Sequence, residues 1–80
     1  MTYRLTPVVS KIMNVLRKYN LDIVRIRGDH IIINSVKPFP ALRRPIVLVN
    51  EKHLSNAVRL NLLRESKEIG INEKEFEGIF

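Results

Sequence analysis

Apolar residues in the first part of the chain recur at the spacing of an α-helix. They stand at Val8, Val9, Ile12, Val15, Leu16 and Tyr19, and polar residues fall on the opposite side at Lys11, Asn14, Arg17 and Lys18. Thr6 before Pro7 is typical of a helix start, with the Thr6 side chain accepting a hydrogen bond from the first turn. Asn20 tolerates the left-handed conformation that closes a helix. The pattern predicts one amphipathic helix between these two signals.

The following stretch changes to residues typical of β-strands. Residues 21–27 are rich in β-branched side chains and predict an extended strand, Gly28 and Asp29 form a turn, and residues 30–34 make a second strand. A two-residue loop predicts the register, in which the facing pairs are Arg27 and His30, Ile26 and Ile31, Arg25 and Ile32, and Val24 and Ile33. Alternation places one group of side chains against a helix: Val24, Ile26, Ile31 and Ile33. The opposite face then carries Arg25, Arg27, His30 and Asn34, with Ile23 and Ile32 among them.

The second half of the chain predicts a third strand and two more helical segments. Residues 36–44 form a loop with two prolines and three cations, and residues 45–49 form the strand. Ser55 caps a helix that ends at Gly70, and its apolar positions are Val58, Leu60, Leu62, Leu63 and Ile69. Asn72 with Glu75 resembles a capping box, which predicts a short terminal turn that packs Phe76 and Phe80.

These elements predict an α+β fold in a single domain that spans residues 1–80. Consecutive strands with short links form a three-stranded antiparallel sheet, and two amphipathic helices must cover one face of it. The other face is left free. This α-β-β-β-α layout is that of double-stranded-RNA-binding-like domains.

Charge adds a functional indication to this fold. The chain carries a net charge of +6, but residues 1–44 hold nine Lys and Arg against two acidic residues, and residues 45–80 hold five against six. A one-sided positive field attracts polyanions such as RNA, although small soluble domains also carry net charge for solubility alone. The chain has no cysteine, which excludes disulfides and thiolate chemistry. No long apolar run indicates a signal peptide or a membrane span, so we expect a cytoplasmic protein.

Short motifs occur in residues 15–30, 47–50, 58–63 and 70–76. Their order and spacing resemble the HicA (YcfA-like) toxin family, and the resemblance spans nearly the whole chain. Residues 15–30 are similar to its helix, basic first strand and Gly-Ser-His motif, which here reads Gly28-Asp29-His30. Residues 47–50, 58–63 and 70–76 are similar to its later strand, its second helix and its Gly-Ile stretch ending in Glu-Phe. The sequence departs from the family where Asn20 replaces a glycine, Asp29 a serine, Leu48 a proline and Asn50 a second histidine.

The resemblance implies an endoribonuclease toxin that cuts mRNA and is silenced by a HicB-type antitoxin. The family's catalytic histidine corresponds to His30. Cleavage of RNA needs no metal or cofactor when a base takes the proton of the 2′-hydroxyl and cations stabilise the charge on phosphorus. On this hypothesis His30 is the acid or base, Gly28 and Asp29 form its supporting turn, and Arg25 and Arg27 bind phosphates. The remaining cations steer the RNA: Lys11, Lys37, Arg43 and Arg44.

Asp29 beside His30 has two opposite expected effects, since its carboxylate repels RNA phosphate but pairs with an imidazolium. Two other functions therefore stay open. One is a non-catalytic RNA-binding module of the same fold, and the other is a degenerate toxin that only binds an antitoxin. An antitoxin or a second copy of the chain would cover Ile23 and Ile32 on the open sheet face. We expect His53 to be a surface residue and the six C-terminal glutamates to be solvated, with Glu65 and Glu68 pairing locally with Arg64 and Lys67.

Overall fold

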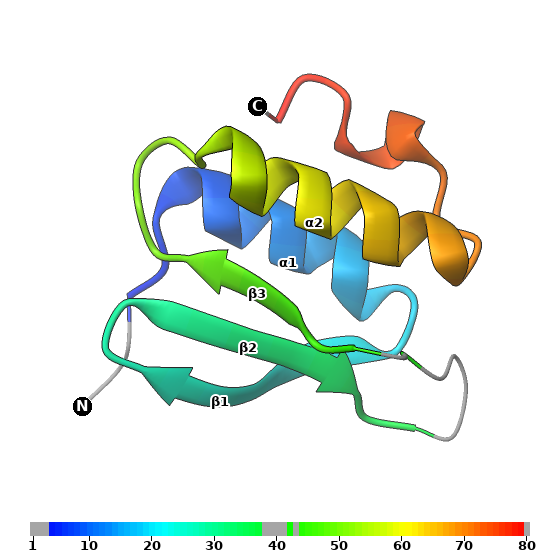
Figure 1. The fold of residues 1–80 in the computed structure, drawn as a ribbon, viewed down its shortest axis with the longest axis horizontal. Helices are drawn as coiled ribbons and strands as arrows, with labels where there is room; N and C mark the ends of the chain where they lie inside the picture. Colours follow the sequence, from blue (N-terminus) through cyan, green and yellow to red (C-terminus); the bar gives the residue numbers. More distant parts are fainter. Residues whose placement is uncertain (1–3, 38–41, 43, 80) are drawn as a thin grey trace.

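Two helices pack on one face of a three-stranded antiparallel sheet (Figure 1). The computed structural model describes residues 4–37, 42 and 44–79. Its elements are α1 (Pro7–Arg17), β1 (Leu21–Arg27), β2 (His30–Ser35), β3 (Ile46–Val49), α2 (Asn56–Glu68) and the 3₁₀ helix η1 (Glu73–Phe76). The predicted α-β-β-β-α order is confirmed, with strand order β1-β2-β3. Much of the predicted 36–44 loop, and Phe80, lie outside the described residues.

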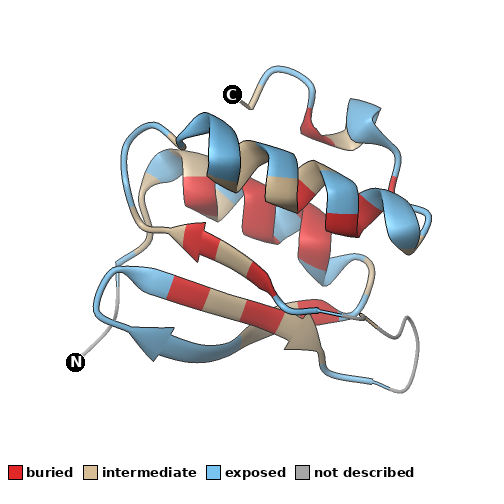
Figure 2. Cartoon of the chain, viewed as in Figure 1, coloured by how far each residue is buried: buried red, intermediate tan, exposed pale blue. Residues whose placement is uncertain are grey.

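The core fills the layer between the helices and the sheet, as the red segments of Figure 2 show. β2 contributes Ile31 and Ile33, and β3 contributes Ile46 and Leu48, all fully buried at alternate positions. The helices and η1 cover them with further buried side chains: Val9, Ile12, Met13, Val15, Leu16, Leu62 and Phe76. The buried side chains alternate along β2 and β3 and follow helical spacing in α1, as the sequence predicts. Ile26 of β1, predicted to lie against a helix, is instead 38% exposed at the edge of the sheet.

The helix ends follow most of the predicted signals. Asn20 has φ 63° and so closes the turn after α1, while the Ser55 side chain accepts a hydrogen bond from the Val58 amide at the start of α2. The prediction for Thr6 was wrong, because its hydroxyl donates to the Glu51 carbonyl instead of capping α1. In η1 the Asn72 side chain accepts from the Lys74 amide.

A β-bulge in β1 corrects the predicted register beyond Arg25. The pairs Arg27 with His30, Ile26 with Ile31, and Arg25 with Ile32 are confirmed, but Ile33 faces Ile23 and not Val24. The extra residue returns Ile23 to the core side, where it is partly buried, and leaves Val24 52% exposed. The predicted faces of Ile23 and Val24 were therefore wrong, because the extra residue of a bulge reverses the inward and outward alternation of the residues beyond it.

Helix α2 differs from its predicted apolar face at two positions. Leu60 is 65% exposed, so it does not belong to the core face. Glu65, expected on the solvated side, is only 3% exposed, and its Oε1 lies 3.8 Å from the Arg64 Nε. Helical spacing explains why Glu65 is buried, because Leu62 and Glu65 are three residues apart and share the inward side of the helix. The Glu65 Oε2 has no hydrogen-bond partner among the residues that the structure describes.

The two edge strands of the sheet differ in what discourages them from pairing with another strand. The backbone N–H of Val47 in β3 donates to the Asn61 Oδ1 of α2 over 3.4 Å, so the helix covers that edge. At the other edge β1 is exposed from Val24 to Arg27, and it carries arginines and a bulge, two features that discourage pairing with another strand. Across the described residues, no helix has the length and apolar character needed to cross a membrane.

Candidate nucleic-acid interface

The β1–β2 turn places His30 at one end of the open sheet face. Gly28 has φ 61°, a conformation that glycine adopts without strain, and Asp29 completes the two-residue loop. His30 is the first residue of β2 and pairs with Arg27 of β1 on one side and with Val49 of β3 on the other. Directly opposed side chains point to the same face of a sheet. The hairpin therefore puts an arginine beside the histidine.

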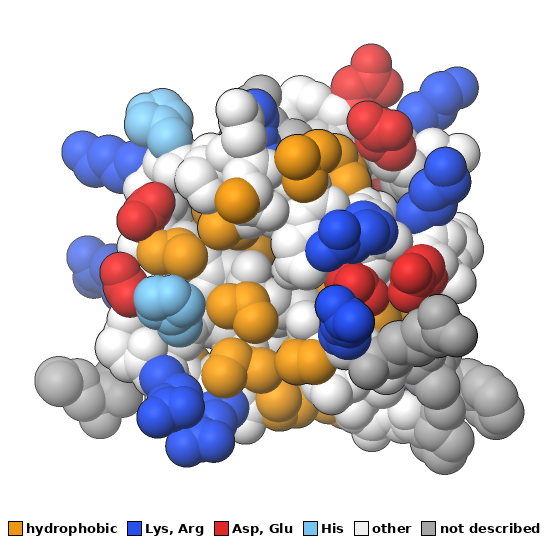
Figure 3. Space-filling view, viewed as in Figure 1, with side chains coloured by type: hydrophobic (Ala, Val, Ile, Leu, Met, Phe, Trp, Pro, Cys, Tyr) orange, Lys and Arg blue, Asp and Glu red, His pale blue; other side chains and the backbone are white. Residues whose placement is uncertain are grey.

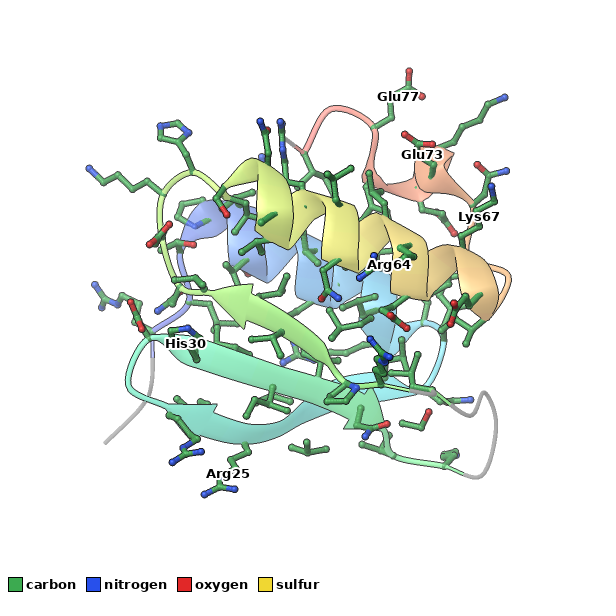
Figure 4. The ribbon with its side chains drawn as sticks, viewed as in Figure 1. Arg25, His30, Arg64, Lys67, Glu73 and Glu77 are labelled. Atoms are coloured by element: carbon green, nitrogen blue, oxygen red, sulfur yellow. The ribbon has the colours of Figure 1, made fainter. Side chains whose placement is uncertain are left out.

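Arg25 extends this cluster by one row along the same face. It pairs with Ile32 and lies two positions before Arg27 in β1, so both guanidinium groups leave the same side of the strand. Both arginines and His30 are exposed. Figure 4 shows Arg25 pointing away from the helices, and Figure 3 shows blue basic side chains beside a pale blue histidine. The structure thus brings together three of the residues expected to contact RNA.

The open face behind this cluster is apolar. Ile32 pairs with Val47, and Val49 follows in the row of His30. All three are partly buried, although no described helix lies on this side of the sheet. Orange side chains form a patch beside the basic cluster in Figure 3. The face therefore combines cations at one end with an apolar centre.

Asp29 holds the His30 ring in one orientation. The Asp29 Oδ1 lies 2.9 Å from the His30 Nδ1, and both side chains are more than half exposed. When Nδ1 carries the proton, it donates to the carboxylate and leaves Nε2 as a free acceptor. An Asp29 carboxylate in this position accepts from the histidine, so it orients the ring as well as adding a negative charge.

Asn50, which stands where the resemblance places a second histidine, has a structural role. Its Oδ1 accepts from the Thr6 amide over 2.8 Å, and its Nδ2 donates to the Arg4 carbonyl over 2.9 Å. Its own amide donates to the Asp29 carbonyl over 2.7 Å. Asn50 thereby ties the N-terminal segment to the turn that carries His30. The sequence holds no signal for these contacts, because the partners of its side chain are more than 40 residues away.

Among the predicted RNA-steering residues that the structure describes, Lys11, Lys37 and Arg44 do not lie beside His30. Lys37 follows β2 and Arg44 precedes β3, so both lie at the end of the sheet opposite the β1–β2 turn. Arg44 lines a cavity of about 270 Å³ with Arg64, Glu65 and Glu68. Arg43 lies outside the described residues.

Lys11 lies at a different place again, on the exposed side of α1. It lines a cavity of about 310 Å³ with Lys52, His53 and Arg59. Sequence reasoning missed Lys52 and Arg59 as members of this group. Their spacing gives no signal, because the cavity forms where two helices far apart in the sequence begin side by side.

A hydrogen bond of Tyr19 lies on the side of the molecule away from the sheet. The Tyr19 hydroxyl donates to the Glu75 Oε2 and so connects the end of α1 with η1. This hydrogen bond raises the pKa of Tyr19, and burial and the negative charge of Glu75 raise it further. The Glu75 carboxylate therefore serves this contact, where the sequence predicts a capping box.

The described residues contain no group of three or more His, Asp or Glu side chains placed to hold a metal ion. Comparison of the chain with protein-family models found no match, and comparisons with curated proteins and with solved structures found none either. The resemblance to HicA toxins therefore stays a prediction from short sequence motifs.

Proposed function

We propose that the chain is a metal-free endoribonuclease that cleaves mRNA, the toxin of a toxin–antitoxin system of the HicA kind. The observation that carries this proposal is the position of His30. Its Nδ1 is held by Asp29, its ring is exposed, and Arg27 lies directly across the hairpin with Arg25 in the next row. An imidazole beside two guanidinium groups offers a general base and two groups that stabilise developing negative charge, which are the functions that metal-free RNA cleavage uses.

In this proposal His30 acts as the general base. Its Nε2 takes the proton from the ribose 2′-hydroxyl, and the resulting oxygen attacks the adjacent phosphorus. The bond from phosphorus to the 5′-oxygen breaks, and that oxygen takes a proton from water or from the imidazolium. Arg25 and Arg27 stabilise the negative charge that builds on the phosphate oxygens, for which the planar guanidinium is well shaped. The products are a 2′,3′-cyclic phosphate and a 5′-hydroxyl.

The free sheet face suggests how the enzyme is held inactive. Ile32, Val47 and Val49 are apolar, adjacent in the sheet and open on the side away from the helices. A HicB-type antitoxin bound there would also cover His30, which shares this face. A second copy of the chain in a homodimer would have the same effect. The α-β-β-β-α order is compatible with a double-stranded-RNA-binding-like fold. An enzyme that cleaves mRNA would act in the cytoplasm.

The proposal is tested with purified protein and an RNA in the presence of EDTA. We expect cleavage that needs no added metal and yields cyclic phosphate ends, because the 2′-oxygen is the nucleophile. A matched RNA with a single 2′-deoxy residue at a mapped cleavage site must resist cutting at that site. Cleavage that depends on a divalent cation, or that continues at the deoxy residue, would overturn the mechanism.

A second function is favoured by one specific observation, the Asp29 carboxylate beside His30. An exposed negative charge in this position disfavours phosphate, and a domain of this fold can bind structured RNA by shape and backbone contacts without chemistry. Retention of intact RNA by the parent protein in the same assay would identify this binding module. Tight binding of a HicB-type protein with no affinity for RNA would indicate an antitoxin-binding protein only.

A further inference from the structure

A basic cavity lies where α1 and α2 begin, outside the site at His30. It has a volume of about 310 Å³, and its polar wall consists of Lys11 from α1, Lys52 and His53 from the segment before α2, and Arg59 from α2. Val8 and Leu54 supply apolar surface. The described residues that line it include no carboxylate. Three permanent cations and an imidazole thus share one concave surface.

Such a surface is suited to an anion. Low-dielectric walls concentrate the field of the cations within a cleft, and a lysine ammonium binds phosphate oxygens as a point charge. The Thr6 hydroxyl donates to the Glu51 carbonyl and does not cap α1, and the first turn of α1 holds no acidic residue, so the positive end of the helix dipole adds to the field beside the cavity. Arg59 is held in place, since its guanidinium donates to the Asn56 Oδ1.

A chain of hydrogen bonds through Asn50 links the turn that carries His30 to the segment that enters the cavity wall. The Asn50 amide donates to the Asp29 carbonyl, and the Asn50 side chain binds the backbone of Arg4 and Thr6. Pro7, the next residue, belongs to the cavity wall. Figure 3 shows both histidines on the same side of the molecule, each with basic side chains nearby and with acidic side chains in the space between them. A polyanion bound at His30 therefore has a second cationic surface within reach along the same edge.

We infer that the cavity lined by Lys11, Lys52 and His53 is a phosphate-binding site. This inference rests on the proposed function for the identity of its ligand, which is a backbone phosphate that flanks the cleaved bond in RNA. The cavity then fixes the path of the strand from the sheet face across the start of both helices. It groups Lys11 of the basic first half of the chain with Lys52 and Arg59 of the second half, which residue order alone does not show.

The first experiment measures RNA binding by a double variant, Lys11→Gln with Lys52→Gln. A 2′-O-methyl oligonucleotide is used because it cannot be cleaved, and its affinity is followed by fluorescence anisotropy between about 50 and 200 mM salt. Loss of two phosphate contacts should flatten the slope of log K against log salt by about 1.4 for a single strand. The control, Lys18→Gln with Lys67→Gln, removes the same charge from exposed lysines that do not line the cavity. Equal slopes for both double variants would overturn the assignment to RNA.

The second experiment tests the cavity without RNA. Inorganic phosphate is titrated into the parent protein while the ring protons of the histidines are observed by NMR. We expect the His53 signals to shift and saturate, and this response to disappear in the Lys11→Gln, Lys52→Gln variant. A His53 that does not respond would overturn the phosphate site.

Together the two experiments separate the inference from the proposed function. A response of His53 to phosphate in a protein that binds no RNA would support the cavity and contradict RNA as its ligand and the proposed function. RNA binding with an unchanged salt slope and a silent His53 would contradict the cavity alone. Lysine-dependent binding of a phosphoserine peptide in place of the oligonucleotide would overturn RNA as the ligand.

Discussion

Replacement of Asn50 by alanine tests whether this residue is structural, as its contacts indicate. The change removes two side-chain hydrogen bonds, to the Thr6 amide at 2.8 Å and to the Arg4 carbonyl at 2.9 Å. A hydrogen bond contributes about 0.5–1.5 kcal/mol net, and the second of these is exposed, so we expect a loss of about 1–2 kcal/mol. For a domain of this size, that loss lowers the melting temperature by about 4–16 °C.

Thermal unfolding followed by circular dichroism provides the measurement, and two further variants sharpen it. Asn50→Asp keeps the oxygen that accepts from Thr6 but loses the donor to Arg4, so it should lose roughly half as much. Asn14→Ala removes an exposed asparagine from α1 and should leave the protein unchanged or slightly more stable, since alanine favours helix. An Asn50→Ala protein as stable as the parent would refute the structural role.

Three other predictions concern the bulge, the tyrosine contact and the histidine turn. Val24→Ala should change the free energy of unfolding by less than about 0.5 kcal/mol, whereas Ile23→Ala should cost about 1–2 kcal/mol, and equal costs in urea unfolding would contradict the bulge. Tyr19→Phe should lose a stabilising contact that is present below about pH 10, the pKa of an unfolded tyrosine, and that the parent loses as pH rises through its raised folded pKa. The two proteins should therefore converge in stability at alkaline pH, and a constant difference would refute this. Asp29→Ala should slow RNA cleavage by no more than about fivefold, because an exposed ion pair contributes about 1 kcal/mol or less. A loss above about a hundredfold would mean that Asp29 itself transfers a proton.

The layout of the fold could be predicted from the sequence because its signals are local. The spacing in α1, the Gly28–Asp29 turn and the Ser55 cap each act within a few residues, and all three are confirmed. The cluster of Arg25, Arg27 and His30 follows from the same turn, since a two-residue loop fixes which residues face each other.

Features that depend on distant contacts were not predictable in this way. The bulge at Val24 moves Ile23 to the opposite face of β1 from the predicted one, and the alternation of residue types gives no sign of this change. Glu65 is buried because α2 turns that side toward the core, although its residue type indicates solvent. The Asn50 contacts and the cavity beside Lys11 join segments that only the folded chain brings together.

The central claim, that His30 removes the proton from the 2′-hydroxyl, is tested most directly by single-turnover RNA cleavage in EDTA by the His30→Ala protein. General acid–base catalysis contributes about 10²–10⁴-fold, so the rate should fall by that factor while circular dichroism and melting temperature remain those of the parent. His53→Ala, the matched control, should retain a rate within about an order of magnitude of the parent, far above that of His30→Ala. A folded His30→Ala protein that cleaves RNA as fast as the parent would contradict the account.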